Sequence, residues 1–307
     1  MLDISAVAPV FKNAALIEKY DALKPGQSFM LANDANLTAY YHLLSNQRGL
    51  NFDWEPMEQG PEKWMIKIIK RSPESDTETI GAIVARDYRK SQALIEYDVD
   101  FSCGGNRTLS QALGGQEGAI KEILQQWKAV DQLPAEGRLN YQGWNLTLLS
   151  KYISQIHHNF VITQTAFITD MAFKVAASNS SRHPEIKNVA EIFSSVGKLF
   201  EHHVETQEKA YFPAIQTLAG AKLVGEEKDL NEEARRLNDA ILTEGKDIVN
   251  KLRQIRLLTN HYTAPVYTSS ACKILYKLLA DYEKDALLHF HLENNILFPK
   301  VLLSGNM

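Results

Sequence analysis

The sequence predicts a mainly α-helical protein: a C-terminal four-helix bundle over residues 140–307, preceded by a small helical module and a small α/β domain. The first observation is that apolar residues recur at helical spacing in four long stretches, near residues 146–177, 184–218, 229–260 and 269–301. The second is that the stretches before residue 140 are shorter and are broken by Pro and Gly. Four long amphipathic helices favour a bundle, and bundle interiors hold metal sites built from facing helices.

Residues 1–72 are predicted to form the small α/β domain. Their pattern gives a helix over 11–22, a turn over 24–27, a strand over 28–32, a helix over 37–45 and paired strands over 52–58 and 63–70. The polar, proline-broken run over 71–76 is then predicted to be a linker.

Residues 77–135 are predicted to form a helical module around one cysteine. One helix starts over 79–84 and another covers 116–128, and the run 133–137 ends the module. Gly104 and Gly105 allow a tight turn, which we expect to leave the Cys103 thiol accessible as a candidate catalytic, redox or metal-transferring group. The alternative is an inert thiol, which is the commoner role for a single cysteine.

Composition excludes several classes of function. The 307 residues carry a net charge of −4 and show no stripe of Lys and Arg, so we expect no nucleic-acid partner. No basic and apolar leader begins the chain and no run approaches about 18 apolar residues, so we expect no membrane span. Two cysteines, Cys103 and Cys272, make no disulfide framework, which favours a cytoplasmic protein. Neither a phosphate-binding glycine loop nor a nucleophile elbow is present.

Two histidines share a spacing that suggests a metal site. His203 and His289 each lie ten residues before the proline of a Phe-Pro pair. Four residues after each histidine comes a residue whose side chain can bind metal. In the second copy this residue is Glu293, and side chains at i and i+4 share one face of a helix. In the first copy it is Gln207, whose neutral amide binds iron more weakly than a carboxylate does. Taken alone, such a pair is more often a solvated surface contact.

The first bundle helix offers two candidate histidines. An apolar stripe through Leu149, Ile153, Ile156 and Phe160 places His157 nearer the core than His158. On the second helix, the spacing to Pro213 favours His203 over His202 as the inward residue.

Several segments resemble the repair-of-iron-centres family of iron-sulphur cluster repair proteins. The segment 288–299 resembles the last bundle helix of that family and 98–105 its cysteine module, and 152–158 and 182–185 resemble the first bundle helix and the loop after it. Residues 20–70 are similar to a small α/β domain often attached to such proteins. The resemblance implies a hemerythrin-like bundle that holds non-haem di-iron, a role in nitrosative and oxidative stress, and damaged iron-sulphur proteins as partners.

The family pattern carries over incompletely. It selects His158, His203, His289 and Glu293 as metal ligands, and it places the first bridging glutamate at Gln207. The third-helix histidine falls near Gly245, and no histidine occurs from residue 204 to residue 260. His261 lies about 16 residues on, roughly 24 Å along a helix, which is too far to replace it. Glu208 or Glu244 serves only if a helix slips or rotates by one residue.

We therefore expect an iron-donating repair protein, rather than a classified enzyme, whose iron is mononuclear or labile or has been lost. The alternative is a metal-free scaffold or regulatory protein that has given up the di-iron centre. A sensor of oxygen or nitric oxide ranks lower, because it needs a complete ligand set with an open coordination position. The sequence leaves a homodimer open.

Overall fold

A computed structural model describes residues 1–24, 26–48, 52–60, 63–70, 78–134, 139–179, 183–221, 228–266 and 268–304, without the side chains of 218–221, 228–235 and 303–304. The predicted linker over 71–76 and most of the predicted boundary over 133–137 lie outside these residues. The chain packs as two compact units, Met1–Asp100 with Arg107–Asn140, and Phe101–Asn106 with Tyr141–Met307. The loop that carries Cys103 thus packs with the bundle. The predicted fold class, mainly helical with a small N-terminal sheet, is confirmed.

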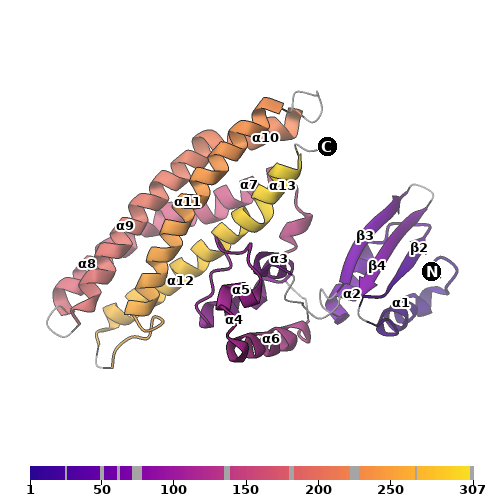
Figure 1. Cartoon of the computed structure of the whole chain (residues 1–307), viewed down its shortest axis with the longest axis horizontal. Coiled ribbons are helices and arrows are strands. Elements are labelled where there is room, and N and C mark those ends of the chain that lie inside the picture. Colours follow the sequence, from indigo (N-terminus) through magenta and orange to yellow (C-terminus); the bar gives the residue numbers. More distant parts are fainter. Residues whose placement is uncertain are drawn as a thin grey trace. The chain divides into compact units, whose positions relative to one another are not determined.

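The first unit contains a four-stranded sheet in the order β1-β2-β4-β3 (Figure 1). The strands are β1 (Leu2–Asp3), β2 (Ser28–Asn33), β3 (Phe52–Gln59) and β4 (Trp64–Lys70). β4 pairs antiparallel with both β2 and β3, and β1 pairs parallel with β2. Alternation along β4 buries Ile66 and Ile68 on one face, as a strand with one covered side requires.

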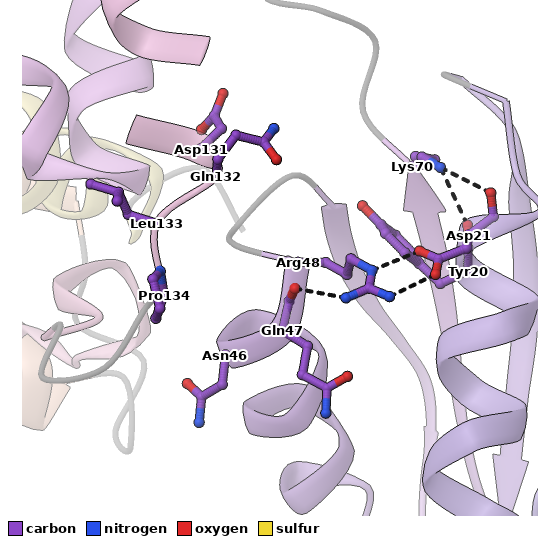
Figure 2. Close-up of a pocket in the computed structure, with 10 residues that line it drawn as sticks. All are labelled: Tyr20, Asp21, Asn46, Gln47, Arg48, Lys70, Asp131, Gln132, Leu133 and Pro134. Atoms are coloured by element: carbon purple, nitrogen blue, oxygen red, sulfur yellow. Dashed lines mark hydrogen bonds and ion pairs between the residues drawn. The ribbon is translucent and has the colours of Figure 1, made fainter. Parts of the chain in front are cut away.

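Helices α1 (Lys12–Asp21) and α2 (Thr38–Arg48) pack their apolar residues against the sheet. Leu16 and Leu44 are fully buried in this core. Figure 2 shows Arg48, at the end of α2, donating from Nε and Nη2 to both carboxylate oxygens of Asp21, each at 2.7 Å. Lys70 Nζ donates to backbone carbonyls at the end of α1, where a cation complements the helix dipole.

The remainder of the first unit is helical. It comprises α3 (Ile80–Arg86), α4 (Ser91–Glu96), α5 (Leu109–Leu113) and α6 (Glu117–Asp131). Thr108 caps α5 through a reciprocal bond with Gln111. Trp127 is buried and donates its indole N–H to the Lys90 carbonyl at 2.9 Å, which ties α6 to the turn before α4.

The second unit is a bundle of four long helical segments (Figure 1). Its elements are α7 (Leu146–Tyr152) continuing into α8 (Asn159–Asn179), α9 (Glu185–Thr206) continuing into α10 (Phe212–Ala221), α11 (Lys228–Leu258), and α12 (Ser270–Leu292) continuing into α13 (Phe298–Ser304). Asn145 and Ser269 cap α7 and α12 through their side-chain oxygens.

Three of the four segments are interrupted by a π-helical turn, at Ile153–His158, Gln207–Tyr211 and Glu293–Leu297. A π-turn inserts one extra residue and rotates the side chains that follow it, and such turns are frequent at functional sites. The predicted stripe is therefore wrong at Ile156, which is 50% exposed. The same turn directs both His157 and His158 inward, each 1% exposed.

One helical segment, Leu146–Asn179, is long and apolar enough to cross a membrane by length and composition. Within the described residues no other helix meets that test. The segment packs as the first helix of the bundle, against α9 and α12.

Candidate metal centre

The five residues that sequence reasoning singled out as metal ligands meet inside the bundle. Each has at most 1% of its surface exposed, and three helical segments supply them: His158, His203, Gln207, His289 and Glu293. Two of them, Gln207 and Glu293, open a π-turn, and His158 closes one. The site therefore depends on backbone irregularities that the i,i+4 spacing did not reveal.

The imidazoles turn their Nε2 atoms toward one point. His203 Nε2 lies 3.3 Å from His289 Nε2, which lies 3.0 Å from Glu293 Oε1. His203 Nε2 is also 3.4 Å from Glu293 Oε2. His158, His289 and Glu293 each offer a ligand atom within 4.8 Å of the others. Two imidazoles and a carboxylate around one point form a donor set that suits iron and other divalent transition metals.

Gln207 bridges this group. Its Oε1 lies 3.0 Å from His158 Nε2, and its Nε2 donates to Glu293 Oε1 at 2.5 Å and lies 3.1 Å from His203 Nε2. Gln207 is therefore an interior amide whose oxygen and nitrogen both contact neighbouring side chains. An amide has one acceptor oxygen and one donor nitrogen, so Gln207 connects these side chains through hydrogen bonds.

Two carboxylates lie on the Nδ1 side of the His158 and His203 rings. Glu208 Oε1 lies 2.6 Å from His158 Nδ1, and Glu244 Oε2 lies 3.6 Å from His203 Nδ1. A carboxylate behind a histidine fixes the ring and directs its other nitrogen at a metal. Sequence reasoning considered Glu208 and Glu244 only as replacement ligands after a helix slip. The structure instead places both outside the ring of ligand atoms.

His157, like His158, is buried and has a carboxylate beside its Nδ1 atom. Its Nδ1 lies 2.9 Å from Asp285 Oδ1, and its ring centre is 5.9 Å from that of His289. Sequence reasoning treated His157 and His158 as alternatives, whereas the π-turn buries both. On the second helix only one histidine is inward, because His203 is fully buried and the His202 side chain is 66% exposed beside Glu244.

The third helix brings no imidazole to the site. A Cβ atom on Gly245 would come within 2.9 Å of Phe290 Cε1, so Phe290 fills the space where a third-helix side chain would begin. Phe290 also stacks on Phe200 and packs edge-on against His203. Within the described residues Glu293 is the only carboxylate among the ligand atoms. The residues present therefore do not fit a di-iron centre with two bridging carboxylates, and they do fit a single ion.

Burial and charge set the protonation of the site. Burial lowers the pKa of His289 to about 4 and also lowers that of His158. Burial opposes a proton on His203 as well, but the charge of Glu293 and contacts with Glu244 outweigh it and raise the pKa to about 9. Burial likewise opposes the Glu293 charge, yet the two histidines hold its pKa well below the usual range. Without a metal, a proton on His203 balances Glu293.

Cys103 is not accessible as predicted. It is 7% exposed, and Asn294 Nδ2 donates to its Sγ at 3.4 Å. Asn295 Nδ2 donates to the carbonyls of Phe101 and Ser102, at 3.1 and 3.0 Å. These two amides, which directly follow Glu293, hold the cysteine loop against the bundle. Cys103 Sγ lies 3.5 Å from the Cβ position at residue 245.

Comparison with known protein families gives three matches along the chain. Residues 156–301 match the hemerythrin HHE cation binding domain, and residues 76–131 match ScdA_N, a domain of unknown function. The resemblance to iron-sulphur cluster repair proteins is confirmed. Residues 1–70 precede the hemerythrin-like part and match an uncharacterized conserved protein family.

The chain is also similar to bacterial proteins of this kind. It is 23% identical to the iron-sulfur cluster repair protein ScdA of Staphylococcus epidermidis over 226 residues, which cover 73% of this chain and 98% of that protein. It is 25% identical to the iron-sulfur cluster repair proteins YtfE of Musicola paradisiaca and Yersinia pestis, over 73% of this chain and 96% of each relative. The hemerythrin-like domain includes His158, His203, His289 and Glu293.

Proposed function

We propose that this chain is a cytoplasmic iron-sulphur cluster repair protein that carries one labile iron ion per hemerythrin-like bundle. The observation that carries the proposal is that buried ligand atoms of His158, His289 and Glu293 lie within 4.8 Å of one another, with His203 Nε2 beside His289 and Glu293. Glu208 and Glu244 lie on the Nδ1 side of His158 and His203. Glu293 Oε2 is buried, and its contact with His203 Nε2 is long, at 3.4 Å, so the oxygen is available to a cation.

Iron is the cargo of this protein, and its own residues govern uptake and release. Bound iron supplies the positive charge that the His203 proton otherwise provides beside Glu293. Loading therefore expels that proton, and reprotonation of His203 favours release. With one carboxylate and a neutral amide, the site holds less negative charge than a two-carboxylate centre, so it binds iron more weakly. A weak site suits a donor in the repair of damaged iron-sulphur proteins under nitrosative or oxidative stress.

Cys103 is the proposed transfer group. Its thiol lies beside Gly245, next to the ligand position left vacant on the third helix. A thiolate is a good iron ligand, and the loop that carries Cys103 packs with the bundle although it precedes the bundle helices in sequence. Asn294 positions the thiol.

The test is iron transfer. Parent protein loaded anaerobically with ferrous iron is mixed with an iron-sulphur enzyme whose [4Fe–4S] cluster has been damaged by nitric oxide, and recovery of enzyme activity is followed. The parent should restore activity beyond an equal amount of free ferrous iron with a chelating buffer. The double variant His289→Ala with Glu293→Ala should not, and Glu205→Ala, an exposed acidic residue of the same helix as His203, should behave as the parent. Equal recovery with the double variant would refute the proposal.

A second candidate function is a metal-free scaffold. The observation that favours it is the contact of Gln207 with His158 and Glu293, together with the packing of Phe290 on Gly245. A proton on His203 balances the charge of Glu293 without an ion, and the Gln207 amide is then held by His158 and Glu293, because a protonated imidazole accepts no hydrogen bond. Absence of bound iron after anaerobic loading would place this candidate first.

A further inference from the structure

The proposed iron ligands are closed off from solvent, since each is at most 1% exposed. A ferrous ion reaches such a centre only past side chains that contact both a ligand and solvent. In the part of the chain that the structure describes, two carboxylates do so: Glu208, beside His158, and Glu244, beside His203. Their side chains are 41% and 24% exposed. Either carboxylate therefore connects the surface of the bundle with a buried imidazole.

Glu244 differs from Glu208 in having a second imidazole, that of His202, on its solvent side. His202 Nε2 lies 3.2 Å from Glu244 Oε1, and the His202 side chain is 66% exposed. His202 and His203 are consecutive on α9, yet they contact different oxygens of the same carboxylate on α11. Glu244 therefore presents one oxygen to an exposed imidazole and the other to a buried one.

The inner half of this arrangement is unsatisfied. Glu244 Oε2 and His203 Nδ1 are 3.6 Å apart, which is too long for a hydrogen bond. Both atoms are buried, and neither has a hydrogen-bond partner among the described residues. Buried polar atoms are normally satisfied by protein, water or an ion. Glu244 Oε2 is therefore available to a cation that moves between the surface and the buried centre.

The outer pair, His202 and Glu244, has the ligand types that ferrous iron binds. Imidazole nitrogen and carboxylate oxygen both suit this ion, and two protein ligands completed by water make a weak site. Glu205, three residues after His202 on the same helix, adds no third ligand because Lys209 pairs with its carboxylate. A weak site suits a loading step, since an ion held tightly at the surface would not move on to the centre.

We propose that His202 and Glu244 form an outer ferrous-ion site through which iron enters and leaves the buried centre. The inference rests on the proposed function, because it takes the buried ligands as the destination of the ion. The ion first binds His202 Nε2 and Glu244 Oε1 at the surface of the bundle. Glu244 Oε2 then leads it to the His203 ring, one of the proposed ligands.

The rate of loading tests the route. Metal-free parent is mixed anaerobically with ferrous iron, and a ferrous chelator added at set times traps the iron that is not yet buried. His202→Ala should slow both loading and release at least tenfold and leave the iron bound at equilibrium unchanged, because a route alters both rates equally. His183→Ala is the matched control. His183 makes the same kind of contact with Glu185, at 3.2 Å, but lies 20 residues before His203, roughly 30 Å along the helix.

Two further variants separate metal binding from charge pairing. His202→Lys keeps a cation beside Glu244 but offers no metal ligand, so it should load as slowly as His202→Ala. His202→Glu loses the opposite charge but supplies a ligand, so it should load nearly as fast as the parent. High salt during the measurement screens attraction by charge alone. Fast loading by His202→Lys with slow loading by His202→Glu would show an ion pair only and would overturn the proposal.

Cobalt(II) titration of the His289→Ala, Glu293→Ala double variant isolates the outer site. This protein should bind one cobalt ion weakly, and adding His202→Ala should abolish that binding, while circular dichroism shows that both proteins fold. A double variant without weak cobalt binding would overturn the outer site. A parent that loads equally fast with and without His202 would overturn the route alone. A parent that takes up no iron would contradict the proposed function, and the route with it.

Discussion

Gly245 and Phe290 are complementary, because the Phe290 ring fills the space that a side chain at residue 245 would need. The separation of 2.9 Å between Phe290 Cε1 and a Cβ at residue 245 leaves no room for a third-helix ligand. Phe290 directly follows His289, so the residue that packs on Gly245 is adjacent in sequence to a proposed iron ligand. This packing keeps the bundle interior tight at residue 245.

Gly245→Ala should therefore destabilise the protein, although Ala is the better helix former. Overpacking costs about 1–3 kcal/mol, which exceeds the gain of about 1 kcal/mol from replacing Gly in a helix. Phe290→Leu should relieve the contact, so that Gly245→Ala becomes neutral or stabilising in that background. Urea unfolding of the four proteins in the cycle measures the coupling. Stabilisation by Gly245→Ala alone would show that Phe290 does not hold this space.

Restoring the missing ligands should create a second metal position. The triple variant Gln207→Glu, Gly245→His and Phe290→Ala supplies a carboxylate and an imidazole and removes the ring that obstructs them. We expect it to bind two ferrous ions per chain, and the parent to bind one. Elemental analysis after anaerobic loading gives the stoichiometry, and Phe290→Ala alone serves as the packing control. A triple variant that still binds one ion would mean that other features limit the site.

Stability without metal should peak near pH 6.5. The pKa of His203 is about 9 in the folded chain, so its proton stabilises the fold below pH 6.5, and this contribution is lost as the pH rises through 9, on the order of 3 kcal/mol. Burial lowers the pKa of His289 to about 4 and that of His291 to about 3, so stability also falls as the pH drops below 6.5. Urea unfolding from pH 4 to pH 9 with a chelator present measures both slopes. Stability that increases between pH 7 and pH 9 would contradict the assignment of the His203 proton.

Cys103 should react slowly with alkylating agents until its loop is released. Asn295→Ala removes the bonds to the Phe101 and Ser102 carbonyls, and we expect the alkylation rate of Cys103 to rise at least tenfold. Cys272, which is fully buried in α12, should stay unreactive and reports on global unfolding. Mass spectrometry of the alkylated peptides distinguishes the two thiols. Rapid alkylation of Cys103 in the parent would mean that the hydrogen bonds of Asn295 do not hold this loop closed.

The sequence predicted the long bundle helices, the pairing of the strands over 52–58 and 63–70, and the residues that meet in the bundle, because each leaves a periodic or spaced pattern. It did not predict the strand Leu2–Asp3 or the short helices Ser91–Glu96 and Leu109–Leu113. It did not predict the π-turns, since an inserted residue has no signature in apolar spacing, and so it treated His157 and His158 as alternatives and placed Ile156 in the core. It also did not predict burial of Cys103, because the amides of Asn294 and Asn295 lie almost 200 residues away. The roles of Glu208 and Glu244 became apparent only once the imidazole orientations were known.

The number of iron ions per chain tests the central claim most directly. Protein purified anaerobically, loaded with ferrous iron and freed of excess metal is subjected to elemental analysis beside the His289→Ala, Glu293→Ala double variant. A single-ion site predicts about one iron per parent chain and almost none in the double variant. Two irons in the parent, none in the parent, or equal iron in parent and variant would contradict it.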